Sequence, residues 1–161
     1  MKSVLISIQP KWCELIASGK KTVEVRKTRP RIAMPFKCYI YMTAGDAVYP
    51  VTINGAPYTC SNVGGMCVIG EFVCDKIITA EEGCYCNIPK AESQVDAFDL
   101  MDYANGKPVY GWHISDLVIY DEPKSLRDFY LAAYRQGNRV RPPKPLTRAP
   151  QSWCYVEEVT P

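Results

Sequence analysis

The chain has 161 residues, of which 47% are hydrophobic and 22% are charged, and its formal net charge is +2. These values are those of an ordinary soluble globule. No apolar run approaches the roughly 18 residues that a membrane helix needs, and the N-terminal residues 1–8 lack the pattern of a secretory signal. We therefore expect a single domain over residues 1–161, located in the cytoplasm and without a membrane partner. The sequence leaves the oligomeric state open.

Strands and short helices are predicted in turn along the chain. Alternating apolar residues predict a strand over 3–9, Pro10 begins a helix, and Gly19 ends it. An insertion at about 45–65 contains the turn signal Asn54-Gly55, which is typical of a hairpin. The other predicted strands cover 22–27, 37–43, 66–79, 110–120 and 152–159, and the other predicted helices cover 91–104 and 125–134.

About six strands with two or three short flanking helices indicate an α+β fold that is mainly β. A small β-barrel with helices at its rim fits this count. The order of the strands does not follow from periodicity.

Charge is distributed unevenly along the sequence. Residues 20–37 contain seven basic residues and one acid, and residues 135–148 contain five basic residues and no acid, whereas 81–128 hold ten of the seventeen acids. This separation favours a basic face that binds phosphates. The alternative is that these segments are solvated loops.

The predicted strand after the first helix carries the most informative residues. Because side chains alternate along a strand, Glu24 and Arg26 should share one face with Thr22, and Val23 and Val25 should face the core. Lys21 lies at the bend before this strand and can reach the same side. We expect these charges to form an outward-facing polar pocket.

The spacing Gly-x-Lys-x-x-Glu-x-Arg, formed by Gly19, Lys21, Glu24 and Arg26, resembles the signature of the ASCH domain family. The preceding residues 6–16 also resemble the start of that family, and residues 111–117 and 151–156 are similar to ASCH-like proteins of bacteria and their phages.

The resemblance implies a PUA-like β-barrel and a role in binding RNA, a nucleotide or a modified nucleobase. Some small bacterial members are amidohydrolases that act on N4-acetylcytidine. In those enzymes the lysine of the motif is catalytic, a threonine occupies the place of Glu24, and a second glutamate lies downstream. This chain keeps Lys21 and has Glu24 in place of that threonine.

Each charged residue of the motif has a binding role and a structural alternative. Lys21 can bind a phosphate, polarise a carbonyl or act as a general base. Glu24 can accept from the exocyclic amine of a base, and Arg26 can hold a phosphate with two hydrogen bonds. The alternative is that Glu24 forms ion pairs with Lys21 or Arg26 that only stabilise the fold.

Five other residues are candidates for contacts with a ligand. Trp112 and Trp153 can stack on a base, whereas Trp12 is assigned to the core. Gln9 can read a base edge with its amide. His113, the only histidine, is placed at the pocket rim with Ser115, where a hydrogen bond between them is more plausible than a metal or triad role.

The eight cysteines are expected to be reduced. Three of them, Cys38, Cys74 and Cys154, lie in apolar strand patterns and are interpreted as core residues. The spacing of the cysteines between residues 60 and 86 does not favour a zinc site. We expect neither a metal nor a cofactor.

Two functions from different classes remain open at this point. The first is a module that binds RNA or a nucleotide through Lys21, Glu24 and Arg26 at the barrel mouth. A sponge for a nucleotide signal would use the same pocket and needs no turnover. The second is a hydrolase that acts on a modified nucleoside of the N4-acylcytidine type or on RNA, with Lys21 and Glu24 as its catalytic residues.

Overall fold

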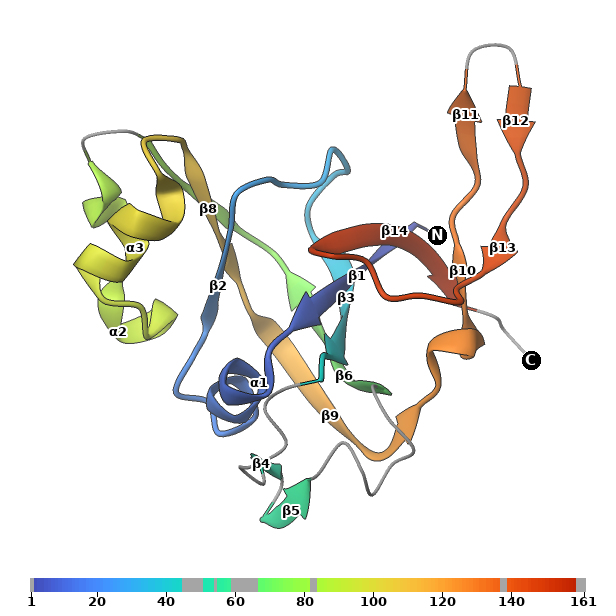
Figure 1. Ribbon diagram of the computed structural model, residues 1–161, viewed down its shortest axis with the longest axis horizontal. Coiled ribbons are helices and arrows are strands. Elements are labelled where there is room, and N and C mark those ends of the chain that lie inside the picture. Colours follow the sequence, from blue (N-terminus) through green and yellow to red (C-terminus); the bar gives the residue numbers. More distant parts are fainter. Residues whose placement is uncertain are drawn as a thin grey trace.

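The computed structural model describes residues 2–44, 51–53, 55–58, 67–81, 84–136 and 139–158. Its largest element is a sheet of seven strands in the order β13-β10-β14-β1-β3-β6-β9 (Figure 1). Within this sheet β1 pairs in parallel with β3, and the other neighbours pair in antiparallel fashion. The strands are β1 Ser3–Ile8, β3 Phe36–Met42, β6 Cys67–Cys74, β9 Ser115–Lys124, β10 Phe129–Leu131, β13 Lys144–Pro145 and β14 Trp153–Glu158.

A second sheet of three antiparallel strands has the order β2-β8-β7. Two further pairs of short strands form separate ribbons, β4 with β5 and β11 with β12. The bounds are β2 Val23–Arg26, β7 Ile77–Ala80, β8 Val109–His113, β4 Val51–Ile53, β5 Ala56–Tyr58, β11 Tyr134–Gln136 and β12 Arg139–Arg141.

The helices are short. They are α1 Pro10–Ala17, α2 Lys90–Ser93 and α3 Ala97–Ala104, with 3-10 turns η1 Tyr85–Asn87 and η2 Leu126–Asp128. As predicted, Pro10 lies in the first turn of α1, and Gly19, with a φ of 75°, supplies the left-handed conformation that turns the chain after it. None of the helices in the described part of the chain has the length and apolarity that crossing a membrane requires.

The expected fold class, α+β and mainly β, is confirmed. The described strands number fourteen, more than the six or so that the sequence indicated. Part of the difference arises because predicted long strands are interrupted. The predicted strand over 66–79 is interrupted at residues 75–76, between β6 and β7. The predicted strand over 110–120 is interrupted at Ile114, between β8 and β9, close to Asp116 with its positive φ of 46°.

The prediction of a helix over 125–134 is wrong. The chain forms the single turn η2 and then strand β10, in which Phe129 pairs with Glu158 and Leu131 with Val156 of β14. The apolar residues of this segment fit both a helix and a strand. Pairing with the distant strand β14 decides between them, because Phe129 is then fully buried.

Most of the predicted insertion at 45–65 lies outside the described residues, as do Asn54 and Cys60. The hairpin expected at Asn54-Gly55 is nevertheless confirmed by its two strands, since Ile53 pairs with Ala56 across a two-residue connection. The seven cysteines of the described part form no disulfide bond. Cys38 and Cys74 are buried in the core as predicted, and Cys154 is only partly buried.

Apolar residues pack on both faces of the large sheet. Strand β1 shows this clearly, because Val4, Ile6 and Ile8 belong to the cluster beneath α1 and Leu5 belongs to a second cluster on the opposite face. A third cluster lies between the three-stranded sheet and the α2–α3 lobe, which consists of η1, α2 and α3. The second strand therefore runs between two apolar regions, and this position determines where its charged side chains lie.

Candidate functional site

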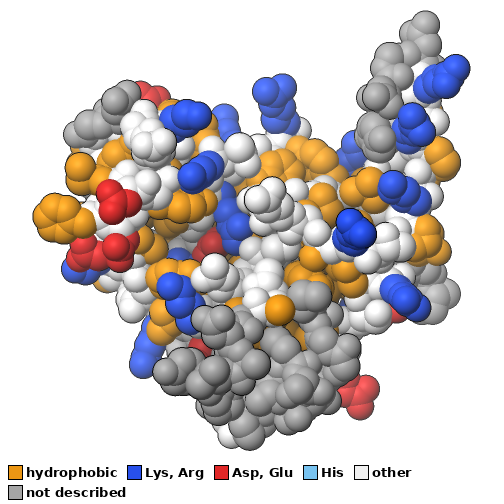
Figure 2. All heavy atoms as spheres, viewed as in Figure 1, with side chains coloured by type: hydrophobic (Ala, Val, Ile, Leu, Met, Phe, Trp, Pro, Cys, Tyr) orange, Lys and Arg blue, Asp and Glu red, His pale blue; other side chains and the backbone are white. Residues whose placement is uncertain are grey.

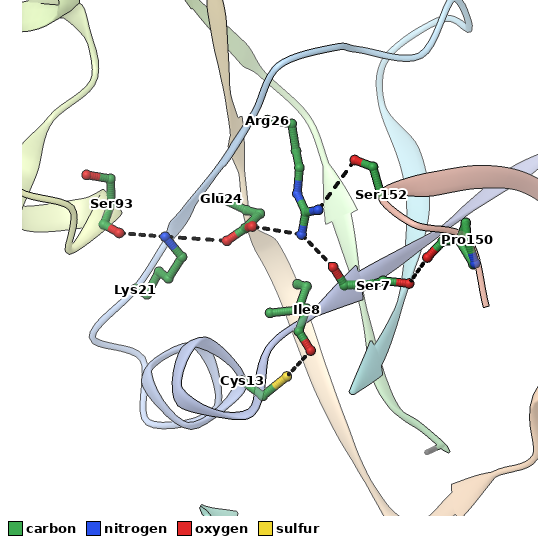
Figure 3. A network of polar contacts seen from close by, with 9 residues as sticks. All are labelled: Ser7, Ile8, Cys13, Lys21, Glu24, Arg26, Ser93, Pro150 and Ser152. Atoms are coloured by element: carbon green, nitrogen blue, oxygen red, sulfur yellow. Dashed lines mark hydrogen bonds and ion pairs between the residues drawn. The ribbon is translucent and has the colours of Figure 1, made fainter. Parts of the chain in front are cut away.

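Lys21, Glu24 and Arg26 form one charged cluster. The Nζ of Lys21 lies 3.4 Å from Oε2 of Glu24, and Nη2 of Arg26 lies 2.9 Å from Oε1. Glu24 therefore lies between two cations, each on a different carboxylate oxygen (Figure 3). The sequence predicted that the three side chains would meet, and the structure brings them together.

The cluster is buried, which differs from the expected outward-facing pocket. The exposed fraction is 2% for the side chain of Lys21, 7% for Glu24 and 11% for Arg26. The alternation along β2 is as predicted, but both faces of the strand are covered. Val25 packs in the cluster under the α2–α3 lobe, so Glu24 and Arg26 face inward, toward the large sheet.

Arg26 connects β2 to the large sheet. Its Nη2 also donates to the carbonyl of Ser7 on β1 at 2.7 Å, and its Nη1 donates to Oγ of Ser152 at 3.4 Å. The hydroxyl of Ser7 in turn donates to the carbonyl of Pro150 at 2.6 Å. One guanidinium thus bonds to three segments, a geometry for which its planar fork of donors is suited.

Lys21 is held by groups from three directions. Its Nζ donates to the carbonyl of Ser93 at the end of α2 and lies 4.7 Å from the centre of the Trp12 ring on α1. Burial lowers the pKa of Lys21, and the negative charge of Glu24 opposes that shift. The ammonium is thus poorly solvated but well coordinated.

The three tryptophans differ in burial and in contacts. Trp112 is fully buried and makes edge contacts with Phe36 and Trp153, so it offers no free face to a base. Trp153 is partly buried, and its Nε1 donates to Oγ1 of Thr28 at 2.9 Å. Trp12 packs against the core cluster, in line with its assignment, but it is only partly buried, and its ring also contacts Lys21.

Two buried donors close to the cluster have no acceptor among the described residues: Nε of Arg26 and Nε1 of Trp112. Trp112 pairs with Glu24 across β2 and β8, and residues directly opposite in an antiparallel pair share a face. Buried donors without a partner are uncommon in folded proteins. They add hydrogen-bonding capacity to the same face as Glu24.

His113, Ser115 and Gln9 do not join the cluster. His113 lies opposite Val23, so it belongs to the other face of the small sheet, and its Nδ1 is 2.6 Å from Oδ1 of Asp75. That hydrogen bond lowers the pKa of Asp75. Ser115 donates to the carbonyl of Val73 at 2.9 Å instead of pairing with His113.

Gln9 is exposed at the start of α1, where its main-chain carbonyl accepts from Trp12 and Cys13. The proposed contact between Gln9 and a base edge therefore stays a prediction. Within the described residues there is no group of three or more His, Cys, Asp or Glu side chains that could hold a metal ion.

A mainly apolar cavity of about 650 Å³ lies in the α2–α3 lobe. Its lining includes Cys86, Ile88, Leu100 and Met101, and none of the three charged residues of the cluster. The cluster itself lies at the base of the lobe. Figure 2 shows a recessed area between this lobe and the rest of the face, with acidic and basic side chains at its floor.

The family model of the ASCH domain matches residues 6–81. This segment is an ASCH domain. It contains the whole charged cluster, and the resemblance that the sequence suggested is confirmed. The α2–α3 lobe and the strands from β8 onward lie beyond the matched residues.

Crystal structures of an ASCH protein from Zymomonas mobilis are similar to the chain. One is 21% identical, with a TM-score of 0.62 over 96% of this chain and 87% of that one. A serine-to-alanine variant of that protein is 20% identical, with a TM-score of 0.62 over 96% of this chain and 88% of that one. A tyrosine-to-phenylalanine variant is 22% identical, with a TM-score of 0.57 over 78% of this chain and 77% of that one. At this identity the likeness establishes the fold. No curated protein matches the sequence.

Proposed function

We propose that this protein binds RNA or a nucleotide, with one base or modified base held at the cluster of Lys21, Glu24 and Arg26. The proposal includes a PUA-like barrel formed jointly by the large and small sheets, a single domain over the whole chain and a cytoplasmic location. The observation that carries it is an ASCH segment in which one carboxylate is buried between two cations.

Burying three charged groups is costly, and a well-packed apolar cluster of the same size is often at least as stable. The cost is easier to understand if the charges recognise something polar. A carboxylate accepts from the amine or imino hydrogens of a base. A guanidinium or an ammonium donates to a carbonyl or phosphate oxygen. Glu24 flanked by Lys21 and Arg26 offers both kinds of group within one small space.

The unpaired donors support the same proposal. Nε of Arg26 and Nε1 of Trp112 have no acceptor in the described part of the chain, and a base with a carbonyl beside its amine would supply one. The partly exposed ring of Trp12 lies against Lys21. It is a better candidate for stacking than Trp112, which the core encloses.

Access to the cluster depends on α2. The carbonyl of Ser93 occupies one hydrogen-bonding position on the ammonium of Lys21, and a ligand carbonyl at this position would replace it. We therefore expect ligand binding to be accompanied by a displacement of α2. This helix has only four residues, so the movement involves a small segment.

The test is a titration of pure protein with nucleosides, nucleotides and short single-stranded RNA. Binding should weaken at least tenfold in Lys21→Met, whereas Lys20→Met, a change at the neighbouring exposed lysine, should bind as the wild type does. Circular dichroism and a thermal melt confirm that both variants are folded. Unchanged affinity in a folded Lys21→Met protein would contradict the proposal.

The second candidate is a hydrolase of the same site, and one observation favours it. Burial lowers the pKa of Lys21 beside the Glu24 carboxylate, and a buried lysine of lowered pKa is suited to act as a general base. Water would add to the acyl carbon of an N4-acylated cytidine, and the products would be a carboxylate and the free amine. Glu24 would carry the proton to the leaving nitrogen.

A panel of acylated nucleosides and RNA separates the two candidates. The hydrolase predicts product release by the wild type and its loss in Glu24→Gln. If every substrate is recovered unchanged while the wild type still binds it, the protein is a binding module. That outcome also fits a sponge for a nucleotide signal, which uses the same cluster and needs no turnover.

A further inference from the structure

The ribbon of β11 and β12 projects away from both sheets (Figure 1). Its strands pair in antiparallel fashion, with Tyr134 opposite Arg141 and Gln136 opposite Arg139. An isolated two-stranded ribbon is marginally stable in water, because it has little apolar surface to bury. A projecting ribbon of this kind is therefore of interest as a surface that contacts another molecule.

The ribbon and the segment that follows it are strongly basic. Arg139 and Arg141 on β12 are exposed, and so is Lys144 on β13. No acidic residue occurs anywhere between positions 129 and 156 in the sequence. Figure 2 shows the Lys and Arg side chains following one another along the ribbon and onto the adjoining surface.

The spacing of these cations suits a phosphate backbone. Arg139 and Arg141 are two positions apart on one strand, so they share a face and are separated by about 6.6 Å along it, which is comparable to the step between neighbouring phosphates of one nucleic-acid strand. Val140, on the other face, is 64% exposed. Arginine also binds phosphate oxygens with two parallel hydrogen bonds, which lysine does not.

We propose that β11, β12 and β13 form an arm that binds the phosphodiester backbone of a nucleic acid, next to the nucleotide held at Glu24. This inference rests on the proposed function and extends it from a single base to a longer strand. The arm reads no base and adds affinity without sequence preference. A membrane surface is a poorer match, because stable attachment to it takes an apolar face or a lipid anchor in addition to basic charge.

The experiment compares a triple variant, Arg139→Gln with Arg141→Gln and Lys144→Gln, with a charge-matched control. The control is Lys2→Gln with Lys76→Gln and Lys107→Gln, three exposed lysines outside the arm and outside α2. Dissociation constants are measured between 50 and 200 mM salt for single-stranded RNA, an RNA duplex and a DNA duplex of equal length. Thermal melts confirm that both triple variants are folded.

Each phosphate contact contributes about 0.7 to the slope of log affinity against log salt for a single strand, and about 0.9 for B-form DNA. If each of the three cations contacts one phosphate, the arm variant should reduce the magnitude of the slope by about 2 for single-stranded RNA and by about 2.7 for a DNA duplex. The loss of affinity should be similar for all sequences tested. The control should keep the wild-type slope, and the binding of a free nucleoside should not change in either protein.

The two proposals fail in different ways. Suppose that Lys21→Met binds nucleosides and RNA like the wild type while the arm variant loses salt dependence. The proposal for the arm is then supported, and the proposal of a nucleotide site at Glu24 is contradicted. If the arm variant keeps the wild-type slope, or if the control loses as much, the inference about the arm is overturned. It is also overturned if the arm is needed for binding to vesicles of anionic phospholipid but not for binding to any nucleic acid.

Discussion

Lys21 donates a hydrogen bond to the main-chain carbonyl of Ser93, a residue 72 positions later in the sequence. The bond joins the ASCH segment to α2, which lies outside the residues that the family model matches. A second contact reinforces it, since the amide of Thr22 donates to the carbonyl of Glu92. The α2–α3 lobe is thus attached directly to the turn that carries the charged cluster.

Glu24→Gln should destabilise the protein by about 3 kcal/mol, because the two buried cations lose their shared counter-ion. Urea unfolding measures the change. Glu14→Gln on the exposed side of α1 is the matched control and should change the free energy of unfolding by less than about 0.5 kcal/mol. Equal stability of the two variants would mean that the ion pairs contribute nothing to the fold.

Arg26→Lys should cost about 1–2 kcal/mol, although the charge is kept. A lysine cannot reach Glu24, the carbonyl of Ser7 and the hydroxyl of Ser152 together, so at least one buried acceptor loses its donor. Arg31→Lys, at an exposed position, provides the comparison in the same unfolding experiment. The bridging role of Arg26 is refuted if both changes have the same small effect.

The local features of the charged segment could be predicted from the sequence, and its surroundings could not. Alternation placed Glu24 and Arg26 on one face of β2 because it depends only on strand geometry. Whether that face was open depended on segments far away in the sequence. The carbonyl of Ser93 and the strand β1 cover the cluster, and no periodicity within residues 21–26 contains that information.

The same limit explains the other differences. The segment at 125–134 has an apolar pattern that fits a helix, and only its pairing with β14 makes it a strand. Trp12 has helical spacing with Leu15 and Ile16, which correctly suggested that it packs on the core, but this spacing did not show that its ring also lies beside Lys21. The position of Trp12 on the helix just before the charged motif was the available signal for this contact, but its helical spacing favoured the core alone.

The pKa of Lys21 should be measured below its usual value of 10.5. Since the folded chain releases this proton at a lower pH than the unfolded chain, the unfolded state binds more protons between the two pKa values. The contribution of Lys21 to stability therefore rises with pH across that window and levels off above about 10.5. Titration of the side chain by NMR tests the direction of the shift.

Glu24→Gln gives the internal control for this titration. The charge of Glu24 raises the pKa of Lys21 against the effect of burial, so its removal should lower that pKa further. A pKa that stays the same or increases in Glu24→Gln would contradict the assigned causes.

Thiol reactivity should separate the cysteines by burial. Iodoacetamide at pH 8 should modify the exposed Cys84 and Cys86 in the native protein, and it should leave the buried Cys38 and Cys74 unmodified. Burial raises the pKa of Cys74 to about 12, so its thiolate is scarce at pH 8 while the core stays closed. Mass spectrometry of the alkylated peptides gives the result, and early labelling of Cys74 would show that this part of the core opens readily.

The central claim is that Lys21 and Glu24 hold a base, and isothermal titration with a panel of nucleosides and short RNAs tests it most directly. The wild type and Lys20→Met should bind the same member of the panel with equal affinity. Lys21→Met should bind it at least tenfold more weakly. Wild-type affinity in a folded Lys21→Met protein, or no binding of any member by the wild type, would contradict the claim.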